Sequence, residues 1–268
     1  MKVGVMDSGV GGITILNAIQ HQLPFLELHY LADDVFAPYG EKDQASLQER
    51  LLKIGRYFEM LGVSAIVVAC NTATVAGIET LRQHTSLPVI GVEPAVKPAC
   101  RISKRREVAV LATPFTAKSE RLNNLIDLWK LDSHVTIYSS VSLAFDIDLW
   151  PDSKAKIQHT VAQLCAEMKR QKVDTLVLAC THYPLVMNFF KAEMEEGCEI
   201  VEPSQGVVAQ LLRRLTETYP LGIDESKVES SVSHIYLYST QSEQSTERFL
   251  HWLSQPDSVV NKQYVLIT

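Results

Sequence analysis

An internal repeat limits the folds open to this chain more than any other feature of its sequence. The segment GVSAIVVACNT at 62–72 resembles QKVDTLVLACTH at 171–182, and the two align with Cys70 on Cys180 at an offset of 110 residues. Each is a short apolar run, rich in β-branched residues and bounded by polar ones, which is the pattern of a buried parallel strand. The repeat therefore predicts two similar units, each with a strand that ends in Ala-Cys.

Two further pairs of segments align at nearly the same spacing. The sequence VEP at 92–94 matches VEP at 201–203 at an offset of 109, and Val3–Ser8 matches Val108–Thr113 at an offset of 105. Upstream of the cysteines, two segments carry apolar residues on one helical face: Leu47–Leu61 and Ile157–Met168. Strands therefore alternate with helices in both units, as they do in mostly parallel sheets with helices on both faces.

This pattern sets the predicted fold class. We predict an α/β fold with two similar domains, built on mostly parallel sheets and related by a pseudo-two-fold axis. Ligands of such sheets bind beyond the carboxyl ends of the strands, so we expect the active site in the cleft between the domains.

The segment 204–268 lies outside the repeat. It predicts a helix at Gly206–Tyr219, a strand at His234–Ser239 and a short helix at Glu247–Leu253. We expect this tail to fold back onto the first unit. The predicted domains are then residues 1–94 with 204–268, a discontinuous domain, and residues 95–203.

Charge and hydropathy argue against several classes of partner. The formal net charge is −6, whereas nucleic acids and anionic membranes both favour a basic surface. No apolar run reaches the roughly 18 residues of a membrane-spanning helix, and the first residues show no signal-peptide pattern. We therefore expect a cytoplasmic protein that binds neither nucleic acid nor membrane.

The chain contains five cysteines, an odd number at wide spacing, which argues against a disulfide framework. No CxxC or HxxxH pair indicates a metal site, so we expect no bound metal.

Polar residues that favour helix starts follow two of the thiols: Asn71-Thr72 after Cys70, and Thr181-His182 after Cys180. A helix N-terminus lowers the pKa of a thiol and binds carboxylates. We interpret these two cysteines as catalytic and Cys100, Cys165 and Cys198 as structural.

Three other positions are candidates for the site. Asp7 is followed by Ser8 and by GVGG at 9–12, where glycines allow a ligand to approach the backbone. The spacing fits neither a dinucleotide loop nor a phosphate loop, and Asp7 suits an ammonium group. His182 has the ordinary pKa for proton transfer beside Cys180. The sequence PYG at 38–40 is either a plain turn or a loop over the cleft.

Taken together, the motifs resemble those of the glutamate racemase family. They are MDSGVGG at 6–12, APYGEK at 37–42, VVACNTAT at 67–74, PVIGVEPAVKPA at 88–99 and LACTHYPL at 178–185. Weaker matches are LATPFTAKS at 111–119 and YSTQSEQSTERFL at 238–250. They follow the family order and span nearly the whole chain, and DSGVGG, ACNTA and CTHYP in combination are specific.

The resemblance implies a bacterial enzyme that interconverts L- and D-glutamate without a cofactor and so supplies D-glutamate for peptidoglycan. It implies that Cys70 and Cys180 are the two acid/base residues and that Asp7 and His182 assist them. The residues that it implies for substrate binding are Ser8, Tyr39, Gly40, Asn71, Thr72, Thr116 and Thr181. The family commonly forms homodimers, but no segment here indicates the dimer surface.

One segment departs from the family pattern. Many members carry a glutamate near the second cysteine, where SVSLAFDID at 140–148 places Asp148. Some members are activated by UDP-N-acetylmuramoyl-alanine through an N-terminal extension. Because Asp7 lies six residues from Met1, we expect appreciable activity without this nucleotide.

Three alternative functions stay open. The nearest is a racemase for another amino acid, such as aspartate. The others are an anion-binding or regulatory protein that kept the fold, and a phosphate-binding enzyme, which the glycine spacing disfavours.

Overall fold

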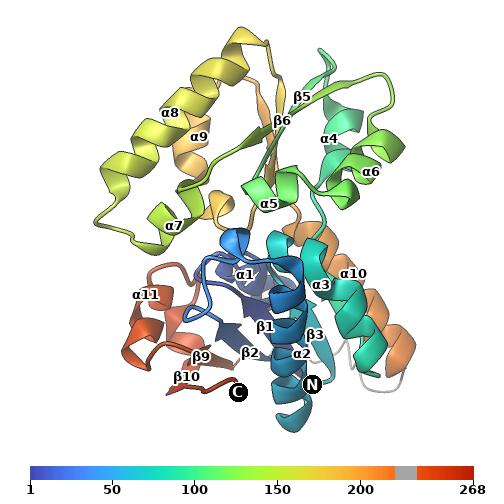
Figure 1. The fold of residues 1–268 in the computed structure, drawn as a ribbon, viewed down its shortest axis with the longest axis vertical. Coiled ribbons are helices and arrows are strands. Elements are labelled where there is room, and N and C mark those ends of the chain that lie inside the picture. The colour runs from blue at the N-terminus through green and yellow to red at the C-terminus, as the bar shows by residue number, and fades with distance from the viewer. Residues whose placement is uncertain (221–233) are drawn as a thin grey trace. The chain divides into compact units, whose positions relative to one another are not determined.

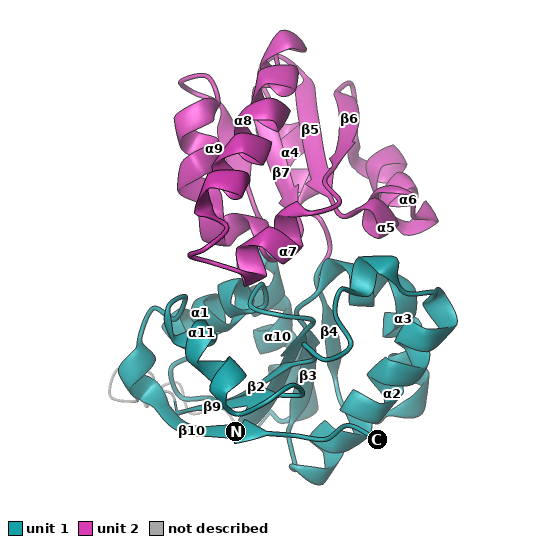
Figure 2. Cartoon of the chain, turned by 60° about the vertical axis from the view of Figure 1, so that its left-hand side comes forward, with its two compact units in different colours: residues 1–92, 204–268 teal, residues 93–203 magenta. Residues whose placement is uncertain are grey.

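The computed structural model describes residues 1–220 and 234–268, and these divide into two compact units. The first unit contains residues 1–92 and 204–268, and the second contains residues 93–203 (Figure 2). The chain leaves the first unit after Val92 and returns after Pro203, so both crossings fall at the repeated VEP segments. The first crossing lies two residues before the boundary predicted at 94.

The first unit is built on one six-stranded sheet in the order β10-β9-β2-β1-β3-β4, and all neighbouring strands are parallel. Its strands are β1 (Lys2–Asp7), β2 (Glu27–Ala32), β3 (Ala65–Val68), β4 (Val89–Gly91), β9 (Ile235–Ser239) and β10 (Val259–Tyr264). Helices α2 (Gln44–Met60) and α3 (Asn71–His84) lie on one face of the sheet, and α1 (Ile13–Gln22) and α10 (Ser204–Thr218) lie on the other (Figure 2).

The second unit has a four-stranded parallel sheet in the order β6-β5-β7-β8. Its strands are β5 (Glu107–Ala112), β6 (His134–Ser139), β7 (Thr175–Ala179) and β8 (Glu199–Val201). Helices α4 (Val96–Ile102) and α6 (Glu120–Trp129) cover one face, and α8 (Lys154–Arg170) and α9 (Met187–Glu193) cover the other (Figure 1). Shorter helices are α5 (Pro114–Ala117), α7 (Leu143–Asp148) and the 3-10 turn η2 (Tyr183–Val186).

The two sheets share one strand order, because β2-β1-β3-β4 in the first unit corresponds to β6-β5-β7-β8 in the second. The registers also correspond: Met6 pairs with Val68 between β1 and β3, and the equivalent residues Leu111 and Leu178 pair between β5 and β7. The strands before both cysteines are buried along their whole length because helices cover both faces. The predicted α/β fold with two similar parallel units is confirmed.

The tail extends the first sheet by two strands. β9 pairs with β2, and β10 pairs with β9. The predicted helix at Gly206–Tyr219 corresponds to α10, and the predicted strand at His234–Ser239 corresponds to β9. The predicted helix at Glu247–Leu253 is shorter in the structure, where α11 is Glu247–Leu250 and follows a 3-10 turn, η4 (Gln244–Thr246). No sequence pattern predicted β10 or the 3-10 turn before it, η5 (Pro256–Ser258).

Local capping fixes the starts of several helices. The side chains of Asp43 and Ser119 accept the backbone N–H of Ser46 and Leu122 at the N-termini of α2 and α6. No helix in the described ranges is both long enough and apolar enough to cross a membrane.

Candidate active site

The predicted site residues lie at the carboxyl edges of the two sheets. In the first unit, Asp7 ends β1 and Cys70 follows β3, and these two strands are neighbours. The chain leaves β1 toward β2 and leaves β3 toward β4, in opposite directions along the sheet, and parallel sheets bind ligands at such a switch point. The second unit repeats the arrangement, with Thr113 after β5 and Cys180 after β7.

Cys70 is the N-cap residue of α3 and is 5% exposed. Its Sγ accepts the backbone N–H of Ala73 at 3.5 Å. The sequence predicted that Asn71 or Thr72 would cap this helix, but the thiol does so itself because its backbone is extended and the helix begins one residue later. The sulfur therefore lies at the positive end of a 14-residue helix, which favours its thiolate form.

Asn71 and Thr72 form the first turn of α3, and both are buried. The Asn71 Nδ2 donates to the carbonyl oxygen of Val92 at 3.2 Å, which fixes the orientation of the amide. Within residues 1–220 and 234–268, its Oδ1 is buried and has no hydrogen-bond partner. A buried acceptor of this kind is costly, so this atom is suited to accept a hydrogen bond from a ligand.

The loop after β1 is organised around the buried Asp7 carboxylate. Its Oδ1 accepts the backbone N–H of Gly9 at 2.9 Å, and the Ser8 hydroxyl lies 3.5 Å from the same oxygen. A Cβ atom on Gly12 would lie 2.7 Å from the Cβ of Asp7 and 3.0 Å from the Tyr30 ring. Only glycine allows the start of α1 to come this close to the carboxylate.

Tyr39 and Gly40 belong to a short 3-10 turn, η1 (Tyr39–Glu41), that packs against α3. The Tyr39 side chain is buried, and its hydroxyl donates to Oδ2 of Asp33 at 2.6 Å. Burial raises the pKa of this hydroxyl well above its ordinary value, and the negative charge of Asp33 adds to the effect. The sequence left open a plain turn or a loop over the site, and the structure shows a turn whose tyrosine is anchored in the interior.

Sequence reasoning missed the partners of this tyrosine. Asp33 is fully buried after β2, and Arg50 of α2 donates to both of its oxygens, from Nε at 2.8 Å and from Nη2 at 2.6 Å. The signal was present in the sequence, because the aspartates at 33 and 34 directly follow the apolar segment ELHYLA at 27–32. Acidic residues at the end of a buried strand are placed where ligands of parallel sheets bind.

In the second unit, Thr116 is fully buried in α5, just beyond β5. The Thr113 hydroxyl donates to Oγ1 of Thr116 at 3.2 Å and accepts the backbone N–H of Thr116 at 3.4 Å. Thr181 is also buried, directly after Cys180. The Tyr183 hydroxyl donates to the carbonyl oxygen of Ala112 at 3.4 Å and so ties the loop after β7 to the end of β5.

Cys180 has a different neighbour from that of Cys70. Its Sγ lies 3.9 Å from Nδ1 of His182, and Nε2 of the same ring lies 3.2 Å from Oδ2 of Asp148, at the end of α7. Burial alone would lower the pKa of His182, but the charge and hydrogen bond of Asp148, with a smaller contribution from Cys180, hold the pKa well above its ordinary value. Asp148 therefore favours the positively charged form of the imidazole beside the sulfur.

The prediction that a helix begins directly after Cys180 is wrong. The residues that follow form only the 3-10 turn η2, which begins at Tyr183, and the regular helix α9 begins at Met187. Pro184 in the turn has no N–H to donate, and the backbone at Val186 departs from helical values. His182, whose protonation Asp148 favours, rather than a helix N-terminus, is the cationic group beside this sulfur.

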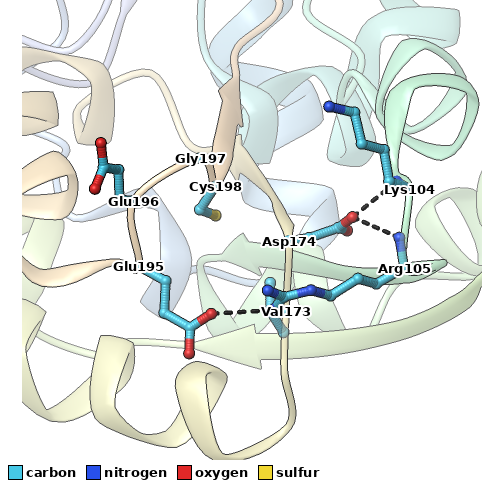
Figure 3. Close-up of a pocket in the computed structure, with 8 residues that line it drawn as sticks. All are labelled: Lys104, Arg105, Val173, Asp174, Glu195, Glu196, Gly197 and Cys198. Carbon is cyan, nitrogen blue, oxygen red and sulfur yellow. Dashed lines mark hydrogen bonds and ion pairs between the residues drawn. The ribbon is translucent and has the colours of Figure 1, made fainter.

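The remaining cysteines lie in other settings. Burial raises the pKa of Cys165 to about 12 and that of Cys198 to about 11, and it also raises the pKa of Cys100. Cys198 borders a pocket of about 130 Å³ at the amino ends of β5, β7 and β8, on the opposite edge of the sheet from Cys180 (Figure 3). Asp174 in this pocket accepts the backbone N–H groups of Lys104 and Arg105, so its carboxylate holds a loop (Figure 3).

Both halves therefore present a buried thiol at a strand end, beside a helix N-terminus in one half and an imidazole in the other, with hydroxyl and carboxylate groups nearby. Such a set can move protons and can bind the polar groups of a small molecule. In the described part of the chain, no group of three or more His, Cys, Asp or Glu side chains is arranged to hold a metal ion.

Comparison with known proteins points in the same direction. The Asp/Glu/hydantoin racemase family matches residues 3–211. The glutamate racemase of Aliarcobacter butzleri (strain RM4018) is 37% identical over 232 residues, which cover 85% of this chain and 89% of that protein.

Solved structures extend the similarity over nearly the full length. Glutamate racemase isoform RacE1 of Bacillus anthracis has a TM-score of 0.82 at 26% identity, covering 99% of this chain and 97% of that one. Escherichia coli glutamate racemase, solved with L-glutamate and the activator UDP-MurNAc-Ala, has a TM-score of 0.79 at 27% identity, covering 99% and 98%. With its repeated parallel units and strand-end thiols, this chain is an isomerase that belongs to the Asp/Glu/hydantoin racemase family.

Proposed function

We propose that the protein interconverts L- and D-glutamate, with Cys70 and Cys180 as the two bases of proton transfer at the α-carbon. The observation that carries the proposal is the pair of buried thiols at corresponding strand ends of two repeated units. Racemisation takes a proton from one face of the carbon and returns one to the other, so it suits two bases. Similarity to glutamate racemases supports glutamate as the substrate.

In this mechanism one cysteine is a thiolate and the other a thiol, and each turnover exchanges their roles. The thiolate takes the α-proton, and the thiol donates its proton to the opposite face. The reverse reaction begins from the opposite protonation states. Because the α-proton is very weakly acidic, hydrogen bonds in a water-poor site must stabilise the charge that develops toward the carboxylate.

Asp7 and His182 assist the adjoining thiols. The fixed Asp7 carboxylate, which accepts the Gly9 N–H, suits the substrate ammonium and keeps it near the first thiol. His182, charged through Asp148, stabilises the second sulfur when that sulfur is a thiolate. In this proposal Asp148 takes the role of the glutamate that many family members carry near the second cysteine, with a shorter side chain.

Hydroxyl, amide and backbone groups bind the polar groups of the substrate in this proposal. The best supported of them is Asn71, whose buried Oδ1 has no partner in the described residues and suits an ammonium donor. The others are Ser8, Tyr39, Gly40, Thr72, Thr116 and Thr181.

The experiment that tests the function is circular dichroism of L-glutamate, and separately of L-aspartate, with purified protein and no added cofactor. We expect the glutamate signal to decay to zero and the aspartate signal to persist. Decay with aspartate alone would favour the aspartate racemase alternative, and no decay with either would favour an anion-binding or regulatory protein.

Cofactor independence is tested in the same assay. Because proton transfer between two thiols needs no electron sink or Lewis acid, we expect dialysis against a chelator to leave the rate unchanged. A rate that requires added pyridoxal phosphate, nicotinamide or metal would contradict this.

We also propose that the D-glutamate enters peptidoglycan. A bacterial strain that requires external D-glutamate should grow without it when it expresses this protein, and it should not grow when it expresses Cys70→Ala. Failure of the unaltered protein to restore growth, despite activity in vitro, would argue against this role.

A further inference from the structure

We propose that Arg50 is a positioning residue of the first half of the site, acting through Asp33 on Tyr39 and so on the surroundings of Cys70. The inference rests on the proposed function only in taking Cys70 as catalytic. Arg50 lies on α2, outside every motif that indicated the site.

Each of the three nitrogens of the Arg50 guanidinium donates a hydrogen bond. Nε and Nη2 bind the two oxygens of Asp33, and Nη1 donates to the carbonyl oxygen of Ile267 at 2.6 Å. The arginine side chain is 11% exposed and that of Asp33 is 0% exposed. A planar fork that grips both oxygens leaves a carboxylate one orientation, and a buried carboxylate without its partner would be strongly destabilising.

Asp33 passes this orientation on to Tyr39. Its Oδ2 accepts the Tyr39 hydroxyl at 2.6 Å alongside Arg50 Nε, and its Oδ1 also accepts the Thr240 hydroxyl at 3.1 Å. Its backbone N–H donates to the carbonyl oxygen of Asp7 at 2.8 Å. The carboxylate is thus held from α2 and from the residue after β9, while the backbone of Asp33 is tied to the end of β1, and the carboxylate holds the tyrosine in turn.

The turn that carries Tyr39 packs on α3, the helix that Cys70 caps. The tyrosine and the thiol are close enough to interact electrostatically, because a charge at Cys70 adds to the effects of burial and of Asp33 that raise the pKa of the Tyr39 hydroxyl. The tyrosine and the thiol are both nearly inaccessible to solvent. Loss of the Asp33 carboxylate contact would therefore release Tyr39 and the turn that packs on the helix capped by Cys70.

The arrangement also gives a role to the tail. Thr240 and Ile267 both lie beyond the second crossing of the chain, and both bind the Arg50–Asp33 pair. The two strands that the tail adds to the sheet thus bring a hydroxyl and a carbonyl to the group that orients Tyr39.

A double-mutant cycle tests the proposal, with Arg50→Gln, Tyr39→Phe and the double variant compared for kcat and KM in both directions. Arg82→Gln is the matched control, because Arg82 also binds a carboxylate and a backbone carbonyl in the first unit, at Glu79 and Val89. We expect Arg50→Gln to lower kcat/KM roughly 10- to 100-fold, since a displacement of about 1 Å at a catalytic centre costs that much. In the Tyr39→Phe background, Arg50→Gln should lower kcat/KM by less than about threefold, because the effects of coupled residues are not additive.

The inference is overturned if Arg50→Gln lowers kcat/KM by the same factor in both backgrounds, or by no more than Arg82→Gln does. Arg50→Lys sharpens the cycle, since lysine keeps the charge but lacks the fork, and we expect it to restore little of the rate. If the Arg50 variants fail to fold, Thr240→Val and Thr240→Ser replace them. Valine should lower kcat/KM several-fold only when Tyr39 is present, and serine should not; equal effects of the two would also overturn the inference.

A second readout does not depend on the substrate. Alkylation of Cys70 by iodoacetamide, followed by mass spectrometry of its peptide, should be faster in Arg50→Gln by roughly threefold or more, because thiol reactivity follows exposure. It should be unchanged in Arg82→Gln. If the variants show this alkylation pattern but the unaltered protein does not racemise glutamate, the proposed function alone is contradicted. Unchanged alkylation in Arg50→Gln would contradict the positioning role alone.

Discussion

Cys70 and Cys180 occupy the same place in their units, because each follows one of the equivalent strands β3 and β7. Different groups nevertheless lie beside the two sulfurs. A backbone N–H at the start of α3 donates to Cys70, whereas a charged imidazole lies next to Cys180. The repeat therefore keeps the position of the thiol but not the group beside it. In the proposed mechanism, duplication supplies one base in each unit, and each unit provides its own electrostatics.

The two sulfurs should also respond differently to pH. The helix N-terminus beside Cys70 carries a fixed partial charge that no titration removes. The charge beside Cys180 belongs to His182 and depends on its proton and on Asp148. A change of pH, or a substitution of a single side chain, should therefore alter the charge beside Cys180 more than the charge beside Cys70.

The largest expected effect comes from the thiols themselves. Cys70→Ala and Cys180→Ala should each lower the racemisation rate by more than about 1000-fold, because each removes one of the two proposed bases. Each should cost only about 1–3 kcal/mol of unfolding free energy. Cys165→Ala is the control, since that cysteine is also buried but lies on α8. Normal turnover by either folded variant would show that its cysteine is not required and would contradict the claim that both halves supply a base.

The second effect concerns the His182–Asp148 pair beside the second thiol. His182→Asn and Asp148→Asn should lower kcat by roughly 100- to 10,000-fold, the usual contribution of a positioned acid or base. Asp148→Glu should retain much of the rate, because it keeps the carboxylate. If Asp148→Asn and Asp148→Glu were equally active, the charge on His182 would not matter to the chemistry.

The third effect is the dependence of stability on pH. The folded-state pKa of His182 is raised, so the protonated pair with Asp148 stabilises the fold fully below the unfolded pKa of about 6.5. This stabilisation is lost as the pH rises through the folded pKa, and each tenfold gain in proton affinity on folding corresponds to about 1.4 kcal/mol. Urea unfolding between about pH 5 and 9 should show a decline that Asp148→Asn flattens. A decline of the same size in both proteins would place its origin elsewhere.

The smallest effect distinguishes two glycines of the first half. Gly12→Ala should cost about 1–3 kcal/mol of unfolding free energy, because its Cβ would collide with Asp7. Gly40→Ala should change stability by less than about 0.5 kcal/mol, since no atom lies within 4 Å of the added Cβ. Thermal unfolding of both variants provides the test, and equal losses would show that the approach of α1 to Asp7 is not constrained as described.

Much of the fold could be predicted from the repeat, because buried parallel strands leave continuous apolar runs whose spacing is visible in one sequence. β1, β3, β5 and β7 follow from this pattern, as do the helices α2 and α8. The edge strand β10 does not, since most of its residues are exposed and polar. Its pairing with β9 depends on contacts that no local pattern records.

The site shows the same limit. Cys70, Cys180, Asp7 and His182 belong to local motifs at strand ends and could be singled out. Arg50 could not, because an arginine on a helix is usually a surface residue and only the fold brings it to Asp33. The wrong helix start after Cys180 has a similar cause, since favourable capping residues do not reveal that a 3-10 turn intervenes.

The central claim is that the two thiols act on opposite faces of one carbon, and racemisation of L-glutamate in D₂O tests it most directly. The α-hydrogens of both enantiomers are followed by NMR and mass spectrometry during the first few per cent of reaction. Two bases predict that the D-glutamate formed carries deuterium at the α-carbon while the remaining L-glutamate keeps its protium. D-glutamate that retains the original protium, or L-glutamate that exchanges as fast as product forms, would show that a single base serves both faces and would contradict the account.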